Sequence, residues 1–257
     1  MQSVWNFDPD VDDRLAFALR AETDQNNAES RVHRHRKGQL LLALRGGVTC
    51  EVPNAMWMVP PHHAVWIPSN MPHRNRVTSN AQICFLFIEP KAALMPDDCC
   101  TLAITPLVRE LILHLADQVP VGSRDESTAR IIVVLLEQLT GLPVEQLYLP
   151  VSNHPKIRFI ADALATDPAD RATLASWAGQ LAMGDRSLAR LIKRETGLTF
   201  GRWRQQLHLI VALRQLSTGA TVQQVAGDLG YDSVTAFITM FKKSLGQSPA
   251  AYFATLR

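Results

Sequence analysis

Histidine is concentrated in one short part of the chain, where five of the eight histidines lie between residues 33 and 73. His33 and His35 are two residues apart, and side chains at that spacing on a strand point to the same face. Gln39 follows ahead of an apolar run, and His73 comes directly after a Pro-Ser-Asn-Met-Pro stretch. Neutral imidazoles bind divalent metal ions and also hydrogen-bond organic ligands. We therefore expect His33, His35, Gln39 and His73 to lie on neighbouring strands around a metal site or a polar pocket.

Three interpretations of this histidine group stay open. A divalent metal would have to accept the amide of Gln39, which is a weaker ligand than a carboxylate. Basic residues at 34, 36 and 37 flank the group and oppose a cation. An organic effector would use the same polar groups against an apolar wall, and in the third interpretation the histidines are merely structural. The candidates for the apolar wall, which could equally be simple core, are Trp57, Trp66, Phe85 and Phe87.

The first 90 residues have the composition of short strands. Segments 56–61, 64–69 and 82–90 are apolar, β-branched or aromatic and are bounded by Pro, Asn or Gly. Proline stays at the segment edges, which is typical of a small barrel or sandwich. His62 and His63 adjoin a Pro-Pro pair and are expected on a loop.

Apolar residues recur at intervals of three and four from Thr105 onward, which predicts helices over 106–119 and 124–141. Pro106 suits a first helical turn. The apolar stripe of the second helix is wide enough for a partner as well as a core, and we expect it to make a two-fold dimer contact. Leu135 on this stripe is the expected contact residue, and the alternative is that it belongs to the core of its own domain. Three prolines in 143–155 interrupt the helical pattern, so we place an inter-domain linker there.

The remaining residues are predicted to be helical and contain an internal repeat. Residues 174–203 and 222–252 share an Ala-Gly-x-Leu stretch, a basic pair followed by Gly, and a closing aromatic residue. Each copy predicts a short helix, a tight turn and a longer basic helix, which is a helix-turn-helix. The expected helices cover about 155–166, 171–182, 185–196, 200–217, 221–229, 233–245 and 249–256.

The spacing of the two copies favours duplex DNA as a partner. Ala178 and Ala226 let the helices of each pair approach closely, and Asp185 and either Asp232 or Ser233 are expected to cap the second helices. The connecting helix 200–217 spans about 27 Å. With the turns added, the two second helices could enter major-groove segments about one DNA turn, near 34 Å, apart.

Residues 155–257 resemble the DNA-binding domain of the AraC/XylS family of bacterial transcription regulators. The resemblance includes Gly-Tyr-Asp-Ser at 230–233 and Gly-Gln-Ser-Pro-Ala-Ala-Tyr at 246–252. Regulators of this family commonly carry a cupin-like domain in front. Residues 25–90 resemble a cupin barrel, with Gly46 and the Ile67-Pro68 turn in support, and metal-binding cupins use three histidines and a glutamate. Gln39 departs from that pattern.

The family resemblance implies which side chains meet DNA. Arginine matches the two acceptors of guanine, whereas lysine contacts to phosphate position a protein without reading sequence. Phe237 and Phe241 are expected in the core, and any single basic residue could also belong to an ordinary solvated face. The first recognition helix would present Arg186, Ser187 and Arg190, the second would present Val234, Thr235 and Thr239, and phosphates would meet Lys193, Arg194, Lys242 and Lys243.

Charge is unevenly distributed along the chain. Residues 1–150 hold 13 Lys+Arg against 17 Asp+Glu, whereas residues 151–257 hold 13 against 7. The basic C-terminal part favours a polyanionic partner. The first residues lack the basic and apolar regions of a secretory signal, no apolar run reaches the roughly 18 residues of a membrane span, and the four cysteines are expected to be reduced thiols.

We therefore predict an α+β multidomain protein that acts as a cytoplasmic, sequence-specific transcriptional regulator. Its expected partners are promoter DNA, a small-molecule effector, a second copy of the chain and RNA polymerase, and a divalent metal is a conceivable cofactor. The alternatives are a metal-dependent cupin enzyme with a helical appendage and an effector-independent DNA-binding protein. The predicted parts are a cupin-like effector-sensing barrel (1–100), a helical bridge for dimerisation (101–142), a linker (143–154) and an AraC-type domain with two helix-turn-helix units (155–257).

Overall fold

The computed structural model describes residues 7–22, 29–53, 55–59, 63–77, 81–118, 126–145 and 148–254. The chain divides into two compact units. The first unit comprises Met1–Val52 and Trp57–Leu147, and the second comprises Pro53–Met56 and Tyr148–Arg257. Within the described ranges, no helix combines the length and the apolar character needed to cross a bilayer.

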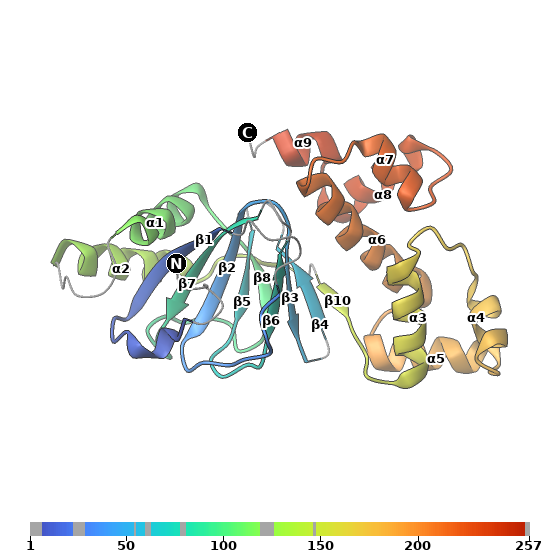
Figure 1. Ribbon diagram of the computed structural model, residues 1–257, viewed down its shortest axis with the longest axis horizontal. Helices are drawn as coiled ribbons and strands as arrows, with labels where there is room; N and C mark the ends of the chain where they lie inside the picture. Colours follow the sequence, from blue (N-terminus) through green and yellow to red (C-terminus); the bar gives the residue numbers. More distant parts are fainter. Residues whose placement is uncertain are drawn as a thin grey trace. The chain divides into compact units, whose positions relative to one another are not determined.

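The described strands of the first unit lie in two sheets (Figure 1). One sheet has the strand order β1-β7-β2-β5-β8-β9, and the other contains β4, β3 and β6. Within the described residues these sheets stay separate, so the closed ring of the predicted barrel is not formed. The strands are β1 (Ala16–Glu22), β2 (Gly38–Arg45), β3 (Val48–Val52), β4 (Ala55–Met58), β5 (His63–Ile67), β6 (Arg74–Val77), β7 (Gln82–Ile88), β8 (Cys100–Ala103) and β9 (Val144–Glu145).

The predicted strands are present, but the histidines sit differently from the prediction. Segments 56–61, 64–69 and 82–90 correspond to β4, β5 and β7, except that residues 60–61 lie outside the described residues. His63 opens β5 rather than lying on a loop, and His62 also falls outside the described part. His33 and His35 do not share a regular strand, because they lie in an irregular segment before β2, where His33 forms an isolated bridge to His73 and His35 forms none.

Two helices cover one face of the six-stranded sheet. Figure 1 shows α1 (Pro106–Asp117) and α2 (Glu126–Leu139) beside β1 and β7. Thr105 caps α1 by accepting a hydrogen bond from the backbone of Val108, and Pro106 occupies its first turn as predicted. Because side chains alternate along a strand, Leu40 and Leu42 of β2 point into this core while Gln39 points to the opposite face.

The expected dimer contact through Leu135 is wrong. Leu135 is 0% exposed and packs in the core shared by the helices and the sheet. The apolar side chains of α2 occupy more than one face, since Val133 and Val134 remain 48% and 44% exposed. The sequence pattern showed a wide stripe but could not show which side of it the sheet would cover.

The second unit consists mainly of helices, with a short strand β10 (Tyr148–Pro150) at its start. The indole nitrogen of Trp203 donates to the backbone oxygen of Pro150 over 2.9 Å, which fixes this segment against α6. Its helices are α3 (Pro155–Thr166), α4 (Leu174–Gln180), α5 (Asp185–Thr196), α6 (Phe200–Ser217), α7 (Val222–Asp228), α8 (Val234–Leu245) and α9 (Pro249–Ala254).

The repeat forms two helix pairs, α4 with α5 and α7 with α8, separated by α6 (Figure 1). Ala178 and Ala226 are buried between the helices of each pair, as small residues at a close crossing must be. The helix starts differ from the prediction in one copy. Ser233 caps α8 through its side chain, whereas the cap of α5 is Gly184 without a side-chain bond and Asp185 is already the first helical residue.

Candidate functional site

Helix α5 has one buried face and one exposed basic face. Leu188, Leu191 and Ile192 are buried against the rest of the domain. The opposite face is solvent-exposed and contains every residue that the sequence assigned to this recognition helix. These residues are Arg186, Ser187, Arg190, Lys193 and Arg194. A helix end with exposed arginines and a hydroxyl offers the donors that base edges and phosphates accept.

Helix α8 is built in the same way but has a less polar exposed face. Phe237, Met240 and Phe241 are buried, which confirms the core assignment of the two phenylalanines. The hydroxyl of Thr239 donates to the backbone oxygen of Thr235 over 2.8 Å, which turns that hydroxyl toward the helix. The exposed candidates on this helix are Val234, Thr235, Thr239, Lys242 and Lys243.

An ion pair links the segment before the first helix pair to the turn inside the second. Arg171 contacts Asp232 at 2.7 Å and also donates to the backbone oxygen of Gly230. Asp232 therefore serves as an ion-pair partner and not as the helix cap. Sequence reasoning missed Arg171 because its partner lies 61 residues away, a separation that no local pattern reveals.

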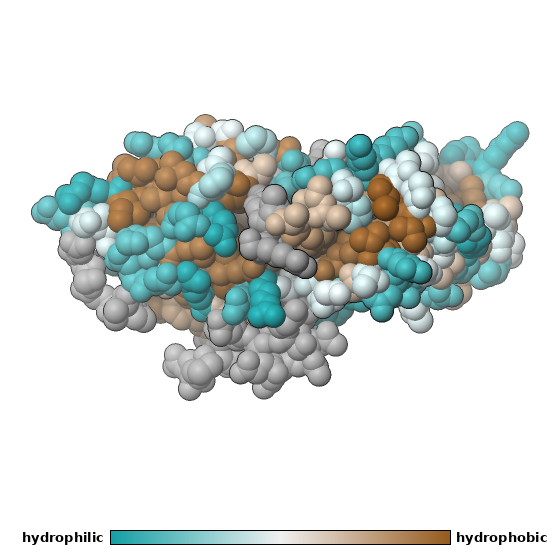
Figure 2. Space-filling model, turned by 90° about the horizontal axis from the view of Figure 1, so that it is seen from above, coloured by the Kyte–Doolittle hydropathy of each residue, from teal (hydrophilic) through white to brown (hydrophobic). Residues whose placement is uncertain are grey.

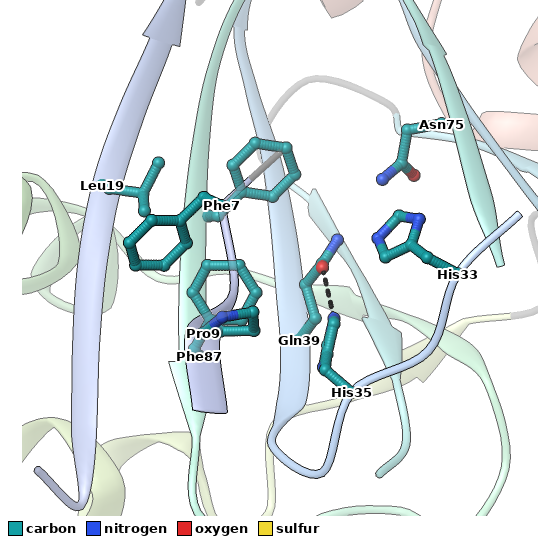
Figure 3. A pocket seen from close by; sticks show the side chains of 9 residues that line it. Phe7, Pro9, Leu19, His33, His35, Gln39, Asn75 and Phe87 are labelled. Carbon is teal, nitrogen blue, oxygen red and sulfur yellow. Dashed lines mark hydrogen bonds between the residues drawn. The ribbon is translucent and has the colours of Figure 1, made fainter. Parts of the chain in front are cut away.

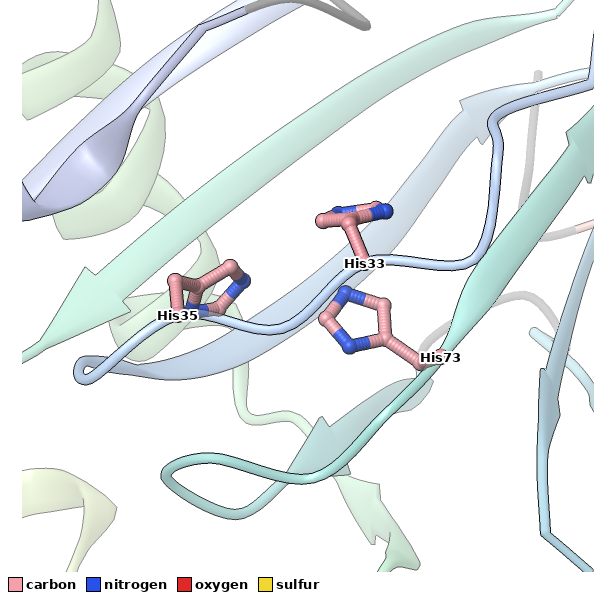
Figure 4. A group of neighbouring side chains, drawn as sticks. All are labelled: His33, His35 and His73. Atoms are coloured by element: carbon pink, nitrogen blue, oxygen red, sulfur yellow. The ribbon is translucent and has the colours of Figure 1, made fainter.

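The three histidines of the first unit converge (Figure 4). The ring centroids of His33 and His73 are 4.4 Å apart, and those of His35 and His73 are 5.1 Å apart. One ligand nitrogen from each ring lies within 4.8 Å of the others. His35 and His73 are buried, and His33 is the most exposed of the three.

Backbone carbonyl groups orient all three imidazoles. The Nδ1 atom of His33 lies 2.9 Å from the Arg31 oxygen, that of His35 lies 2.6 Å from the Lys37 oxygen, and that of His73 lies 2.9 Å from the Met71 oxygen. A carbonyl oxygen only accepts, so each Nδ1 must carry the proton and donate. In the neutral rings, the atom left with a lone pair is therefore Nε2 in every case.

Burial favours the neutral form of His35 and His73. Desolvation lowers the pKa of His35 below its ordinary value. Burial likewise lowers the pKa of His73 to about 3, because a charged ring is unfavourable away from water. These two rings are therefore uncharged and each offers a lone pair.

His33 and His35 form one side of a small cavity and apolar rings form the other (Figure 3), whereas His73 contacts the two histidines without lining the cavity. Gln39 lies between the two sides, and its Oε1 atom is 3.1 Å from Nε2 of His35. The cavity measures about 30 Å³, room for one or two waters. Its lining residues are Phe7, Pro9, Leu19, His33, His35, Gln39, Asn75, Phe85 and Phe87.

Two predicted wall residues lie elsewhere. Trp66 pairs with Leu40 across β5 and β2, so its ring faces the helix-covered core and not the histidines. Its indole nitrogen donates to the backbone oxygen of Pro96 over 2.8 Å. Trp57 is buried on β4 and does not line the histidine cavity.

Two of the basic residues beside the histidines pair with one acidic residue. Lys37 is fully buried, and its Nζ atom contacts Glu89 at 2.5 Å. Arg36 pairs with the same carboxylate. Asp10 accepts hydrogen bonds from the backbone nitrogens of both basic residues, which fastens the N-terminal segment over this loop. The single carboxylate of Glu89 therefore offsets one of these two positive charges, and Asp10 places a second negative charge beside them.

The two units thus define a class of protein, a DNA-binding regulator with two helix-turn-helix motifs and a separate ligand-binding unit. Residues 15–145 match the family described as the AraC-like ligand binding domain, and residues 177–255 match a helix-turn-helix domain family. The chain belongs to the AraC family of transcriptional regulators.

Known proteins of this kind are similar over different lengths. The chain is 57% identical to the HTH-type transcriptional regulator NimR of Escherichia coli (strain K12) over 242 residues, which cover 94% of this chain and 88% of NimR. It is 32% identical to the HTH-type transcriptional regulator AlkR of Acinetobacter baylyi over 45% of this chain and 38% of AlkR. The crystal structure of ToxT from Vibrio cholerae has 12% identity, covers 94% of this chain and 97% of ToxT, and gives a TM-score of 0.41.

Proposed function

We propose that the protein controls transcription by reading promoter DNA through the exposed faces of α5 and α8. The observation that carries this proposal is the exposure of all ten residues assigned to DNA on these two helices. A recognition helix must keep its outer face free while its inner face packs, and both helices meet that requirement. Relatives named as transcriptional regulators support the same function.

The two recognition helices contribute differently to DNA recognition. Arg186, Ser187 and Arg190 on α5 supply the donors for base readout. The exposed methyl groups of Val234 and Thr239 on α8 suit thymine methyl groups, so sequence discrimination rests more on α5. Phosphates are met by the remaining basic residues of both helices, Lys193, Arg194, Lys242 and Lys243.

The protein acts by binding and not by catalysis, in keeping with the names of its relatives. We expect a cytoplasmic protein because the promoter DNA that it would bind lies in the cytoplasm. The parts work in the predicted division, with 1–100 sensing, 101–142 bridging, 143–154 linking and 155–257 binding DNA. If the protein activates transcription, RNA polymerase is the additional partner that it must contact.

A homodimer is formed through the exposed apolar side chains of the helical bridge. Leu107 on α1 and Val133 and Val134 on α2 are each about half exposed. Figure 2 shows one face of the molecule coloured by hydropathy, on which hydrophobic side chains lie among hydrophilic ones. A two-fold contact would remove such side chains from water. Replacing Val134 with Asp would test this contact, because it should lower the oligomeric state without entering the core.

The effector binds at the histidine cavity, through His33, His35, Gln39, His73 and Phe85. This is where polar lone pairs and aromatic rings meet in one enclosed place. Effector binding at this cavity can regulate DNA binding only if the protein has two conformations that differ in their affinity for the effector.

The DNA-binding proposal is tested by selecting bound sequences from a random duplex library and footprinting the selected site. We expect one enriched site with two adjacent major-groove segments protected on one face. Recovery of no preferred sequence, with salt-sensitive binding to all duplexes, would contradict sequence-specific regulation.

A further inference from the structure

We infer that the ligand of the first unit is a divalent transition-metal ion, held by the Nε2 atoms of His33, His35 and His73 with Gln39 beside them. The inference deepens the proposed function and rests on it for the role of this cavity as the sensing site. It starts from how the backbone orients the rings.

Three separate carbonyl groups place the same tautomer on three converging histidines. Each Nδ1 donates to a main-chain oxygen two residues away in the sequence, at 2.6–2.9 Å. Histidines that ligate metals characteristically use the second ring nitrogen in this way, which fixes the ring and leaves the other lone pair for the ion. Three such rings, with one ligand nitrogen each within 4.8 Å of the others, have the arrangement that a metal ligand set requires.

Several buried polar atoms in and beside the rings have no hydrogen-bond partner. His73 is 1% exposed, and its Nε2 atom has no hydrogen-bond partner among the described residues. The same holds for the amide nitrogen of Gln39, which is 2% exposed, and for Oδ1 of Asn75. Buried polar atoms without a partner are costly, and a metal ion bound at Nε2 of His73 would remove that cost.

The pair formed by His35 and Gln39 leads to the same conclusion. With its proton on Nδ1, His35 presents a lone pair to Gln39 Oε1, which is also an acceptor, and the two atoms are 3.1 Å apart. Ligand bonds of about 2.1 Å place neighbouring ligand atoms about 3.0 Å apart in octahedral and about 3.4 Å apart in tetrahedral geometry. The observed separation fits two ligands of one ion, whereas an amide turned the other way would donate to the ring instead.

The size of the cavity excludes most organic ligands in this conformation. Pockets for small organic molecules typically measure about 300–1,000 Å³. The histidine cavity measures about 30 Å³, which accommodates an ion with a water. The partial exposure of His33 leaves an approach from solvent, and Arg36 and Lys37 are held in ion pairs with Glu89.

The chemistry of the donors limits the kind of metal. Neutral imidazole nitrogens and one amide oxygen suit borderline ions such as Zn²⁺ and Co²⁺, whereas Ca²⁺ and Mg²⁺ prefer oxygen ligands. The ligand atoms lie up to 4.8 Å apart, so side-chain movements of about 1.4 Å bring them to tetrahedral spacing at the bond lengths above.

The test uses Co²⁺ alone, added to the full chain purified without a histidine tag and treated with a chelator. We expect one Co²⁺ per chain with a visible d–d absorption band, and displacement of that band by Zn²⁺. Replacing His33 or His73 with Ala should weaken Co²⁺ binding by at least about 10- to 100-fold. Loss of a group that only hydrogen-bonds to a metal ligand already has an effect of that size. His33→Ala keeps the test informative if the more buried His73→Ala variant fails to fold.

Two further variants sharpen the result. His114 lies exposed on α1 outside the cluster, so His114→Ala is the matched control and should bind Co²⁺ like the wild type. Gln39→Glu supplies a stronger ligand and should bind at least as tightly. Absence of the band, or wild-type Co²⁺ affinity in both His33→Ala and His73→Ala, overturns the inference. Selection of a preferred DNA site by the same preparation would then leave the proposed regulatory function standing, so the two failures are distinguishable.

Discussion

Arg190 on α5 provides the sharpest test of how the protein reads DNA. It is solvent-exposed and forms no hydrogen bond or ion pair with any other described residue, so Arg190→Ala removes no internal contact. The free energy of unfolding should therefore change by less than about 0.5 kcal/mol. A bidentate contact to a base contributes about 1–3 kcal/mol, which weakens binding to the selected site about 5- to 150-fold.

Fluorescence anisotropy at fixed salt would measure this, with the selected duplex and its single-position variants as competitors. We expect the preference at one base position to relax while the other preferences persist. Arg158→Ala is the matched control, because Arg158 is also an exposed arginine of the second unit but lies on α3 beside Asp162. A folded Arg190→Ala protein with unchanged affinity and unchanged base preference would refute the register assigned to α5.

Three further predictions concern electrostatics and stability. Lys242→Ala should weaken binding to all duplexes alike and reduce the slope of log affinity against log salt by about 0.9, and a selective loss at one sequence would contradict a phosphate contact. Leu135→Ala should lower the free energy of unfolding by about 2–5 kcal/mol in urea denaturation, whereas Val134→Ala should change it little; equal effects would place Leu135 on the surface. Burial, assisted by the nearby Arg204 charge, lowers the pKa of His208 to about 4. Because the unfolded chain then binds more protons, stability should fall from about pH 6.5 toward pH 4, and a His208→Gln variant that keeps the full pH dependence would disprove this cause.

The helical part of the fold could be predicted because its signals are local. The start of α1 at Pro106 and the cap of α8 at Ser233 depend on residues within one turn. The repeat added a second, independent observation for the two helix pairs. The outward residues of α5 and α8 were implied by the family resemblance, and they lie opposite the buried positions, which are spaced three and four apart along each helix.

The residues whose location was predicted wrongly are those that contact residues far away in the sequence. The sequence shows that Trp66 and Leu135 are apolar but not which neighbours they pack against. The packing of α1 and α2 on the sheet places both side chains in the same core. Glu89 pairs with Arg36 and Lys37 from more than 50 residues away. The orientation of the three histidines depends on carbonyl groups whose direction is set by the irregular segment before β2, which no residue pattern specifies.

Strand β2 connects the candidate ligand site to the helical bridge within the first unit. Gln39 faces the histidine cavity, and the next residue, Leu40, is embedded in the core beneath α1 and α2. A ligand that displaces Gln39 would therefore act on a strand whose opposite face has no free space. Close-packed cores transmit such displacements because they contain few voids to absorb them. The helices that cover the sheet are also those with exposed apolar side chains, so we propose that a displacement at the cavity is passed to the surface through which two copies would meet.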